Sequence, residues 1–173
     1  MNAKAGIVTA TAGWAALTPV AAMTPAGFDW RGWTGGFMIA AVASYLPDLD
    51  HDRSTAGQAV GRSARHLRHL FGGHRMGTHS IFFVILIYLA ASYILDEPVQ
   101  ARAAATGIAA HIWCDLLTVQ GVGLLWPLSR TKIHIGFMRT GSRSEDIYIR
   151  LVQITGVIVS VFYLYQFALG GPA

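Results

Sequence analysis

Three short stretches of this sequence place histidine and aspartate side chains close together, and these residue types bind divalent metal ions and activate water. The stretches read LPDLDH at residues 46–51, GGHRMGTHS at 72–80 and HIWCDLLT at 111–118. Mixed imidazole and carboxylate ligands suit Zn²⁺, Mn²⁺ or Fe²⁺ better than Ca²⁺. The candidates exceed the three or four protein ligands of a single zinc, so we predict one or two ions, Zn²⁺ or Mn²⁺ first among them. The candidate ligands are Asp48, Asp50, His51, His74, His79, His111 and Asp115.

The stretch at 111–118 carries the most specific signal. His111 and Asp115 are four residues apart in an apolar segment, so on a helix they share one face. Such a pair either chelates one ion or forms a buried hydrogen bond without a metal. Cys114 lies about 100° around the helix from Asp115, and we expect it to be a small buried residue. Because it is the only cysteine, an intrachain disulfide or a thiolate metal cluster is excluded.

The other two stretches stand at the predicted ends of apolar segments. Pro47 can end one segment and release the chain into a turn. In an extended backbone Asp48 and Asp50 would point the same way, and a turn could bring in His51 as well. A helix end followed by a hydrated acidic loop is the simpler interpretation of this stretch alone. Thr78 is the predicted N-cap of the next apolar segment, which places His79 in its first turn. For either histidine of that stretch, the alternative is an ordinary hydrogen-bonded loop residue.

The composition around these stretches is that of a membrane protein. Hydrophobic residues make up 53% of the 173 residues and charged residues only 13%, whereas soluble domains have roughly 25% charged residues. The apolar residues come in runs that approach the roughly 20 residues of a spanning helix. We therefore predict an all-α fold, a polytopic membrane helical bundle of about five spans, in a single integral membrane domain over residues 1–173. The predicted spans are 5–23, 33–47, 79–95, 101–118 and 147–169.

The first and fourth predicted spans differ from the others in composition. Both are rich in Ala, Gly and Thr, which is typical of helices that pack against other helices rather than against lipid. The first also resembles a secretory signal, because Lys4 precedes its apolar part. Its Ala/Thr/Gly mixture is less hydrophobic than a signal core, so we expect a retained membrane helix.

Basic residues gather in two long connections between the spans, residues 48–77 and 119–146. All but Arg31 and Arg102 of the 13 lysine and arginine residues then lie on one side of the membrane, which the positive-inside rule makes the cytoplasmic side. We predict a multi-pass protein of a bacterial-type inner (plasma) membrane, with the N-terminus and both long loops cytoplasmic and the C-terminus outside. This topology accounts for the pI near 9.6, so no nucleic-acid partner is expected.

Two parts of these loops are candidates for contact with membrane lipid. If RSARHLRHLFGGHR, residues 62–75, is helical, Leu67, Leu70 and Phe71 lie on one side of a helix resting on an anionic membrane surface. A solvated loop is the alternative. The later LLWPL is either a lid or lipid-binding loop, or a plain interfacial anchor through Trp126.

The topology brings the three stretches to one membrane face, because the second predicted span ends, the third begins and the fourth ends there. A metal site at this face predicts hydrolysis of an ester or phosphoester in a lipid or lipid-linked substrate, since a bound ion lowers the pKa of water and polarises the bond under attack. Asp50 would be a second ligand or the general base, His74 would protonate the leaving group, and Arg75 would hold a phosphate. The first-choice ligands are Asp48, His79, His111 and Asp115.

The same residues also fit a protein that is not an enzyme. A structural metal site would clasp three helices together and fill every coordination position with protein, whereas a catalytic site keeps one open for water. A divalent-ion carrier would place its ligands near the bilayer midplane rather than at span ends. The sequence contains no nucleotide-binding glycine loop or nucleophile elbow, which disfavours ATP and serine-hydrolase chemistry.

Four motifs occur in the order LPDLDH, HRMGTHS, HIWCDLLTVQGVGLLWPLS and RTGSRSE. Together they resemble the YdjM family of inner-membrane proteins, and the resemblance covers residues from about 46 to 146. The resemblance implies a multi-span membrane protein with a His/Asp metal site and a metal-dependent hydrolase activity. All seven candidate ligands stand at positions that match polar motif residues of the family. One departure is Gly6, which stands where family members commonly have a histidine in an N-terminal Thr-His pair. If that histidine is a ligand, this protein binds one metal fewer or replaces it with another group.

Overall fold

The computed structural model describes residues 7–15, 23–24, 27–28, 30–95 and 97–168. These residues form a helical bundle with one pair of two-residue strands, so the all-α prediction is confirmed apart from that pair. A helical segment at 7–15 comes first. It is followed by β1 (Met23–Thr24), β2 (Gly27–Phe28), α2 (Trp30–Ala43), the 3₁₀ helix η1 (Leu46–Asp50), α3 (Thr55–Val60), α4 (Ser63–Leu70), the 3₁₀ helix η2 (Gly77–His79), α5 (Ile81–Leu95), α6 (Pro98–Leu116) and α7 (Arg143–Ala168).

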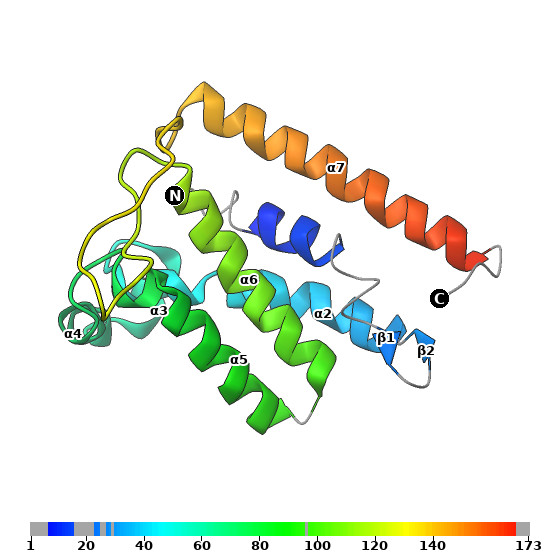
Figure 1. Cartoon of the computed structure of the whole chain (residues 1–173), viewed down its shortest axis with the longest axis horizontal. Coiled ribbons are helices and arrows are strands. Elements are labelled where there is room, and N and C mark those ends of the chain that lie inside the picture. Colours follow the sequence, from blue (N-terminus) through cyan, green and yellow to red (C-terminus); the bar gives the residue numbers. More distant parts are fainter. Residues whose placement is uncertain (1–6, 16–22, 25–26, 29, 96, 169–173) are drawn as a thin grey trace.

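Helix α6 is the centre of the bundle, with α2 and α5 packed against it (Figure 1). Small residues allow this close packing, as the Ala- and Gly-rich composition predicts. At Gly107 a side chain would overlap the carbonyl group of Ala40 on α2. The buried core on one side of α6 contains Ala43, Phe83, Ala104, Ile108, Ile112 and Val122.

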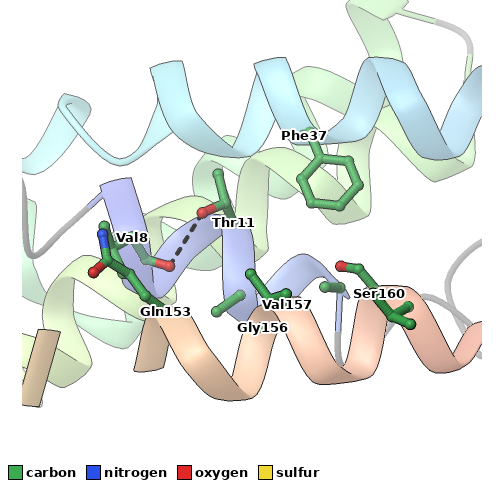
Figure 2. A pocket seen from close by; sticks show the side chains of 10 residues that line it. Val8, Thr11, Phe37, Gln153, Gly156, Val157 and Ser160 are labelled. Carbon is green, nitrogen blue, oxygen red and sulfur yellow. Dashed lines mark hydrogen bonds between the residues drawn. The ribbon is translucent and has the colours of Figure 1, made fainter. Parts of the chain in front are cut away.

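The segment 7–15 lies between α7 and the rest of the bundle (Figure 1). Gly156 of α7 faces Ala12 so closely that a side chain at this glycine would meet the Ala12 methyl group. Beside this contact, Figure 2 shows an open, mostly apolar pocket of about 500 Å³ between segment 7–15, Phe37 of α2, and α7. The hydroxyl group of Thr11 in its wall donates to the backbone carbonyls of Ile7 and Val8. The other polar side chains in the walls are Gln153 and Ser160 of α7, and the remaining lining residues are apolar or glycine.

Each predicted span contains helical residues, but the helices differ from the spans in length. Helix α2 has 14 residues and α5 has 15, both shorter than the roughly 20 residues that a spanning helix requires. Within the described ranges, no helix combines the length and the apolar composition needed to cross a bilayer.

Two local predictions are settled by the helix boundaries. The prediction that Thr78 is the N-cap is wrong. Helix α5 begins at Ile81, and the Ser80 hydroxyl takes the capping role by accepting the Phe83 backbone N–H at 3.2 Å. Thr78 lies instead in η2, with its side chain turned to other partners. The stretch at 62–75 does contain a helix, α4.

The polar connections gather at one end of the bundle, where α3, α4 and the loop between α6 and α7 lie together (Figure 1). Backbone hydrogen bonds tie this loop to the segment before α5: Gly123 N–H donates to the Arg75 carbonyl at 2.7 Å, and Ile81 N–H donates to the Leu124 carbonyl at 3.0 Å. The Phe71 ring packs against Trp126 at a centroid distance of 5.8 Å. This end of the molecule holds the candidate site.

Candidate metal centre

Three of the predicted ligands meet at the end of the bundle. Asp48 comes from η1, His79 from η2 and His111 from α6, and each offers a ligand atom within 4.8 Å of the other two. The Asp48 Oδ1 atom lies 3.6 Å from His111 Nε2 and 4.0 Å from His79 Nε2. The predicted convergence of the three stretches is therefore confirmed. Of the two conformations that the sequence allows after Pro47, an extended backbone and a turn, the structure has a turn, the 3₁₀ helix η1.

Asp115 adds a second carboxylate to this group. It follows His111 by one helical turn, and its Oδ2 atom lies 3.7 Å from His111 Nε2 and 3.2 Å from His79 Nε2. The predicted i, i+4 face of α6 thus presents both side chains to His79. Two imidazole nitrogens face two carboxylates, a donor set that suits Zn²⁺ or Mn²⁺.

Hydrogen bonds on the far side of each imidazole fix which nitrogen carries the proton. His111 Nδ1 lies 2.6 Å from the carbonyl oxygen of Ser44, which can only accept, so Nδ1 is the donor. His79 Nδ1 lies 3.0 Å from the Thr78 hydroxyl, which itself donates to Asp50 at 2.8 Å. His79 Nδ1 is therefore a donor too. In the neutral state both rings turn an unprotonated Nε2 toward the carboxylates.

The two Nε2 atoms supply a test of whether these residues fit a metal. Both are buried, and neither has a hydrogen-bond partner within the described part of the chain. A buried polar atom without a partner costs about 1–3 kcal/mol, so a converging pair of such atoms requires an explanation. A cation between the two nitrogens and the carboxylates would satisfy all of them. The residues therefore fit a bound metal ion.

Arg75 supports Asp115 from behind. Its guanidinium group donates to Asp115 Oδ1 at 3.0 Å and to the Thr118 hydroxyl at 2.9 Å. The side chain is only 3% exposed, and the backbone adopts a φ of 63°, a conformation that is costly for a residue other than glycine. A guanidinium group buried in this way is not presented to a ligand in solvent. The predicted phosphate-binding role of Arg75 does not match its position.

Asp50 lies behind His79, outside the group of converging ligand atoms. Its Oδ2 atom accepts from Thr78, and its Oδ1 atom accepts from His74 Nδ1 at 2.8 Å. Burial alone would raise the pKa of the Asp50 carboxyl. The hydrogen bond and charge of His74, with the charge of His79 and the hydrogen bond from Thr78, outweigh burial, and the pKa falls below its ordinary value. Asp50 is thus an ionised carboxylate with both oxygens engaged. The roles predicted for it, metal ligand or general base, would require it to leave these bonds.

His74 and His51 continue a line of imidazoles from the site toward the surface. The His74 ring lies 5.5 Å from that of His79, and His51 lies 4.4 Å from His74, measured between ring centroids. His51 Nδ1 accepts the Arg53 backbone N–H, and partial burial followed by the charge of His74 lowers the pKa of His51. Both residues are near the site, but neither belongs to the group of mutually close ligand atoms.

Two groups that support the site are not predicted by the sequence. Thr78 has the sequence position of a helix cap, and only its place beside His79 indicates another role. The Ser44 carbonyl gave no signal, since any residue supplies a backbone oxygen. Gly6, where the family pattern has a histidine, lies outside the described residues. Cys114 is buried as predicted, with its thiol 3.0 Å from the Thr9 hydroxyl.

Comparison with known proteins gives a consistent result. A family model described as YdjM inner membrane protein matches residues 2–171. The uncharacterized protein YvsG of Bacillus subtilis (strain 168) is 33% identical over 128 residues, which cover 73% of this chain and 76% of YvsG. The inner membrane protein YdjM of Escherichia coli (strain K12) is 35% identical over 139 residues, 76% of this chain and 66% of that protein. No solved structure matches the chain.

Proposed function

The chain belongs to the YdjM inner membrane protein family, and from this premise we propose that it is a membrane-embedded metal-dependent hydrolase. Its substrate would be an ester or phosphoester of a lipid or lipid-linked molecule at the cytoplasmic membrane face. One observation carries the proposal: two buried imidazole nitrogens without hydrogen-bond partners converge on the carboxylates of Asp48 and Asp115.

The four groups divide into an inner set and an outer one. The side chains of His79, His111 and Asp115 are 0%, 3% and 1% exposed, whereas that of Asp48 is 14% exposed. We assign the inner three as the ligands of one ion, Zn²⁺ or Mn²⁺, which matches the three protein ligands of catalytic zinc sites. When bound, the ion would lower the pKa of a coordinated water and polarise the bond under attack. Asp48 is then the side chain that water and substrate meet first.

A second ion has less support than the first. Its ligands would come from Asp50, His51 and His74, and the structure commits the Asp50 oxygens and His51 Nδ1 to hydrogen bonds. His74 keeps one ring nitrogen beyond its bond to Asp50, and its side chain is 23% exposed. It therefore remains the candidate proton donor to a leaving group.

The substrate proposal comes from the surroundings of the site. Lys132 of the loop between α6 and α7 extends its ammonium group to within 3.4 Å of the His74 carbonyl. We assign the phosphate-binding role to this exposed lysine in place of Arg75. Arg65 of α4 and Arg62, which precedes this helix, are exposed at the same end of the bundle, and such basic residues attract anionic lipid headgroups.

The membrane arrangement is part of the same proposal. We place the site end of the bundle at the cytoplasmic face, in a multi-pass protein with the N-terminus inside and the C-terminus outside. The distribution of the 13 lysine and arginine residues supports this orientation, since only Arg31 and Arg102 fall on the other side. Membrane lipid is the proposed partner, and the exposed apolar residues of α5 and α7 are suited to it.

A structural metal clasp is the second candidate function. The deep burial of His79, His111 and Asp115 favours it, because an ion bound there would join η2 to the end of α6 whether or not it reacts. With Asp48 as a fourth ligand, no position would remain for water. The two functions differ in whether the bound ion accepts an exchangeable ligand.

The test begins with metal content. The native protein, purified in detergent without chelator, should hold about one transition-metal ion per chain by elemental mass spectrometry, and His111→Ala should lose it. His134→Ala, which changes an exposed loop histidine, is the matched control and should keep it. A native protein that stays empty after incubation with Zn²⁺ and Mn²⁺ would exclude both candidate functions. Chelator-sensitive hydrolysis of phosphoesters in anionic lipid vesicles, reduced in Lys132→Gln, would support the enzyme, whereas a metal-loaded protein without turnover would support the clasp.

A further inference from the structure

A chain of three hydrogen bonds runs behind the proposed metal ligand His79. His79 Nδ1 lies 3.0 Å from Thr78 Oγ1, Thr78 Oγ1 lies 2.8 Å from Asp50 Oδ2, and Asp50 Oδ1 lies 2.8 Å from His74 Nδ1. Thr78, His79 and Asp50 are 2%, 0% and 1% exposed. Water therefore has little access to replace the two bonds among these three residues.

The direction of each bond follows from counting protons. The Thr78 hydroxyl has one hydrogen and two acceptor sites. If it donated to His79, its oxygen would face the Asp50 carboxylate at 2.8 Å with no proton between them, which is repulsive. It must therefore donate to Asp50 and accept from His79. The other oxygen of Asp50 accepts from His74 Nδ1 at 2.8 Å, so both carboxylate oxygens act as acceptors, in agreement with this direction.

Both imidazoles of the site carry their proton on Nδ1, but different acceptors hold it there. His111 donates to the Ser44 backbone carbonyl, an acceptor that no side-chain substitution removes. His79 depends on Thr78, a hydroxyl whose direction is set by Asp50. The protonation site of His79 can therefore be changed by substitution while that of His111 stays fixed, and His111 becomes an internal reference.

We propose that Thr78 is a positioning residue for the metal site: it accepts the Nδ1 proton of His79, passes the hydrogen bond to Asp50, and so leaves the Nε2 lone pair of His79 free for the ion. The assignment to a metal rests on the proposed function, whereas the tautomer assignment does not. His74 holds the other Asp50 oxygen and keeps the carboxylate from turning away. Outer partners of this kind typically change metal affinity by about 10–100-fold when they are removed.

A plain structural role for Thr78 predicts a different result. If its hydroxyl only joined η2 to η1, its removal would lower the stability of the fold while the proton of His79 stayed on the same nitrogen. The protonation site of His79 in the metal-free protein is therefore the measurement that separates a positioning role from a structural one.

The experiment compares native protein, Thr78→Val and Thr78→Ser in detergent. Imidazole ¹⁵N chemical shifts of histidine-labelled, metal-free protein report which nitrogen is protonated, and competition with a chromophoric chelator gives the Zn²⁺ affinity. We expect the valine variant, which keeps the size of threonine but lacks the hydroxyl, to move the His79 proton to Nε2 and to bind Zn²⁺ about 10–100-fold more weakly. Serine should restore both properties. Thr131→Val, at an exposed loop position, is the matched control and should change neither.

A second variant keeps the proposal testable if Thr78→Val does not fold. Asp50→Asn preserves size, and its amide group can donate to Thr78, which would let the hydroxyl turn toward His79. We expect the fixed tautomer and the Zn²⁺ affinity to be lost although Thr78 is present.

Three outcomes are informative. A folded Thr78→Val with an unchanged His79 tautomer and Zn²⁺ affinity overturns the proposal. A changed tautomer with unchanged affinity overturns the link to metal binding. If the native protein binds no Zn²⁺ but its tautomer still responds to Thr78, the proposed metal function fails while the hydrogen-bond relay stands.

Discussion

Arg75 and Asp115 form a buried ion pair in which the guanidinium group donates to Asp115 Oδ1 at 3.0 Å while Asp115 Oδ2 faces the imidazoles of His79 and His111. One carboxylate thus joins a fixed cation on one side to the proposed metal position on the other. Because an ionised carboxylate is costly to bury alone, Arg75 allows Asp115 to remain charged where it is 1% exposed. The pair also explains why Arg75 faces the core and not a substrate.

Removal of the charge at Arg75 should destabilise the protein. Arg75→Gln leaves the Asp115 carboxylate without its cation, and breaking a buried pair typically costs about 3–5 kcal/mol. The free energy of unfolding measured in detergent should therefore fall by this amount. The Zn²⁺ affinity should also fall, because Asp115 is less well oriented. Arg130→Gln changes an exposed loop arginine and should have little effect. Equal stabilities of the two variants would contradict the role of the pair.

Metal binding should itself stabilise the fold. A ligand that binds only the folded state adds about 2.7 kcal/mol when its concentration is 100 times Kd. Added Zn²⁺ should therefore raise the thermal unfolding temperature of the metal-free protein, and a chelator should reverse the effect. His79→Ala should show no such rise, whereas His66→Ala, at an exposed position on α4, should behave like the native protein. An equal rise in His79→Ala would place the ion elsewhere.

The contact between α6 and α2 should not tolerate a side chain at Gly107. Gly107→Ala would bring its methyl group into the carbonyl of Ala40, so the helices must separate, at a typical cost of about 1–3 kcal/mol for overpacking. Gly35→Ala on α2 is the matched control, because nothing lies within 4 Å of its added methyl group. That change should be neutral or stabilise the helix by about 0.5–1 kcal/mol. Unfolding midpoints in detergent compare the two, and equal effects would argue against the close approach.

The proposed membrane orientation can be checked with reporter fusions. Alkaline phosphatase is active only outside the cytoplasm, so a fusion after Ala173 should be active. A fusion within the loop between α6 and α7, after Arg130, should be inactive there but fluorescent when the reporter is green fluorescent protein. The opposite pattern would place the candidate site on the outer face and would contradict the orientation inferred from the basic residues.

Much of the site could be predicted from the sequence because its residues obey local geometry. His111 and Asp115 had to share a face once their segment was helical, since residues four apart on a helix are neighbours. The helical content followed from long apolar runs. The meeting of three stretches followed from the order in which helices begin and end, and the distances among Asp48, His79 and His111 confirm it.

Tertiary structure alone decided what each polar side chain does within the site. The sequence predicts that Arg75 binds phosphate, but its guanidinium group bonds to Asp115. It predicts that Asp50 is a ligand or a base, but Asp50 bonds to His74. It predicts that Thr78 caps a helix, but Thr78 bonds to His79. The physical reason is that a polar side chain takes its direction from whichever partner is near it. The partners of Asp50 and Arg75 are 24 and 40 residues away along the chain, and that of Thr78 is the next residue, in a turn of unforeseen shape. Sequence therefore determined which chemical groups gather at this end of the bundle, while the packing of η1, η2 and α6 determined which of them face the proposed metal and which support it from behind.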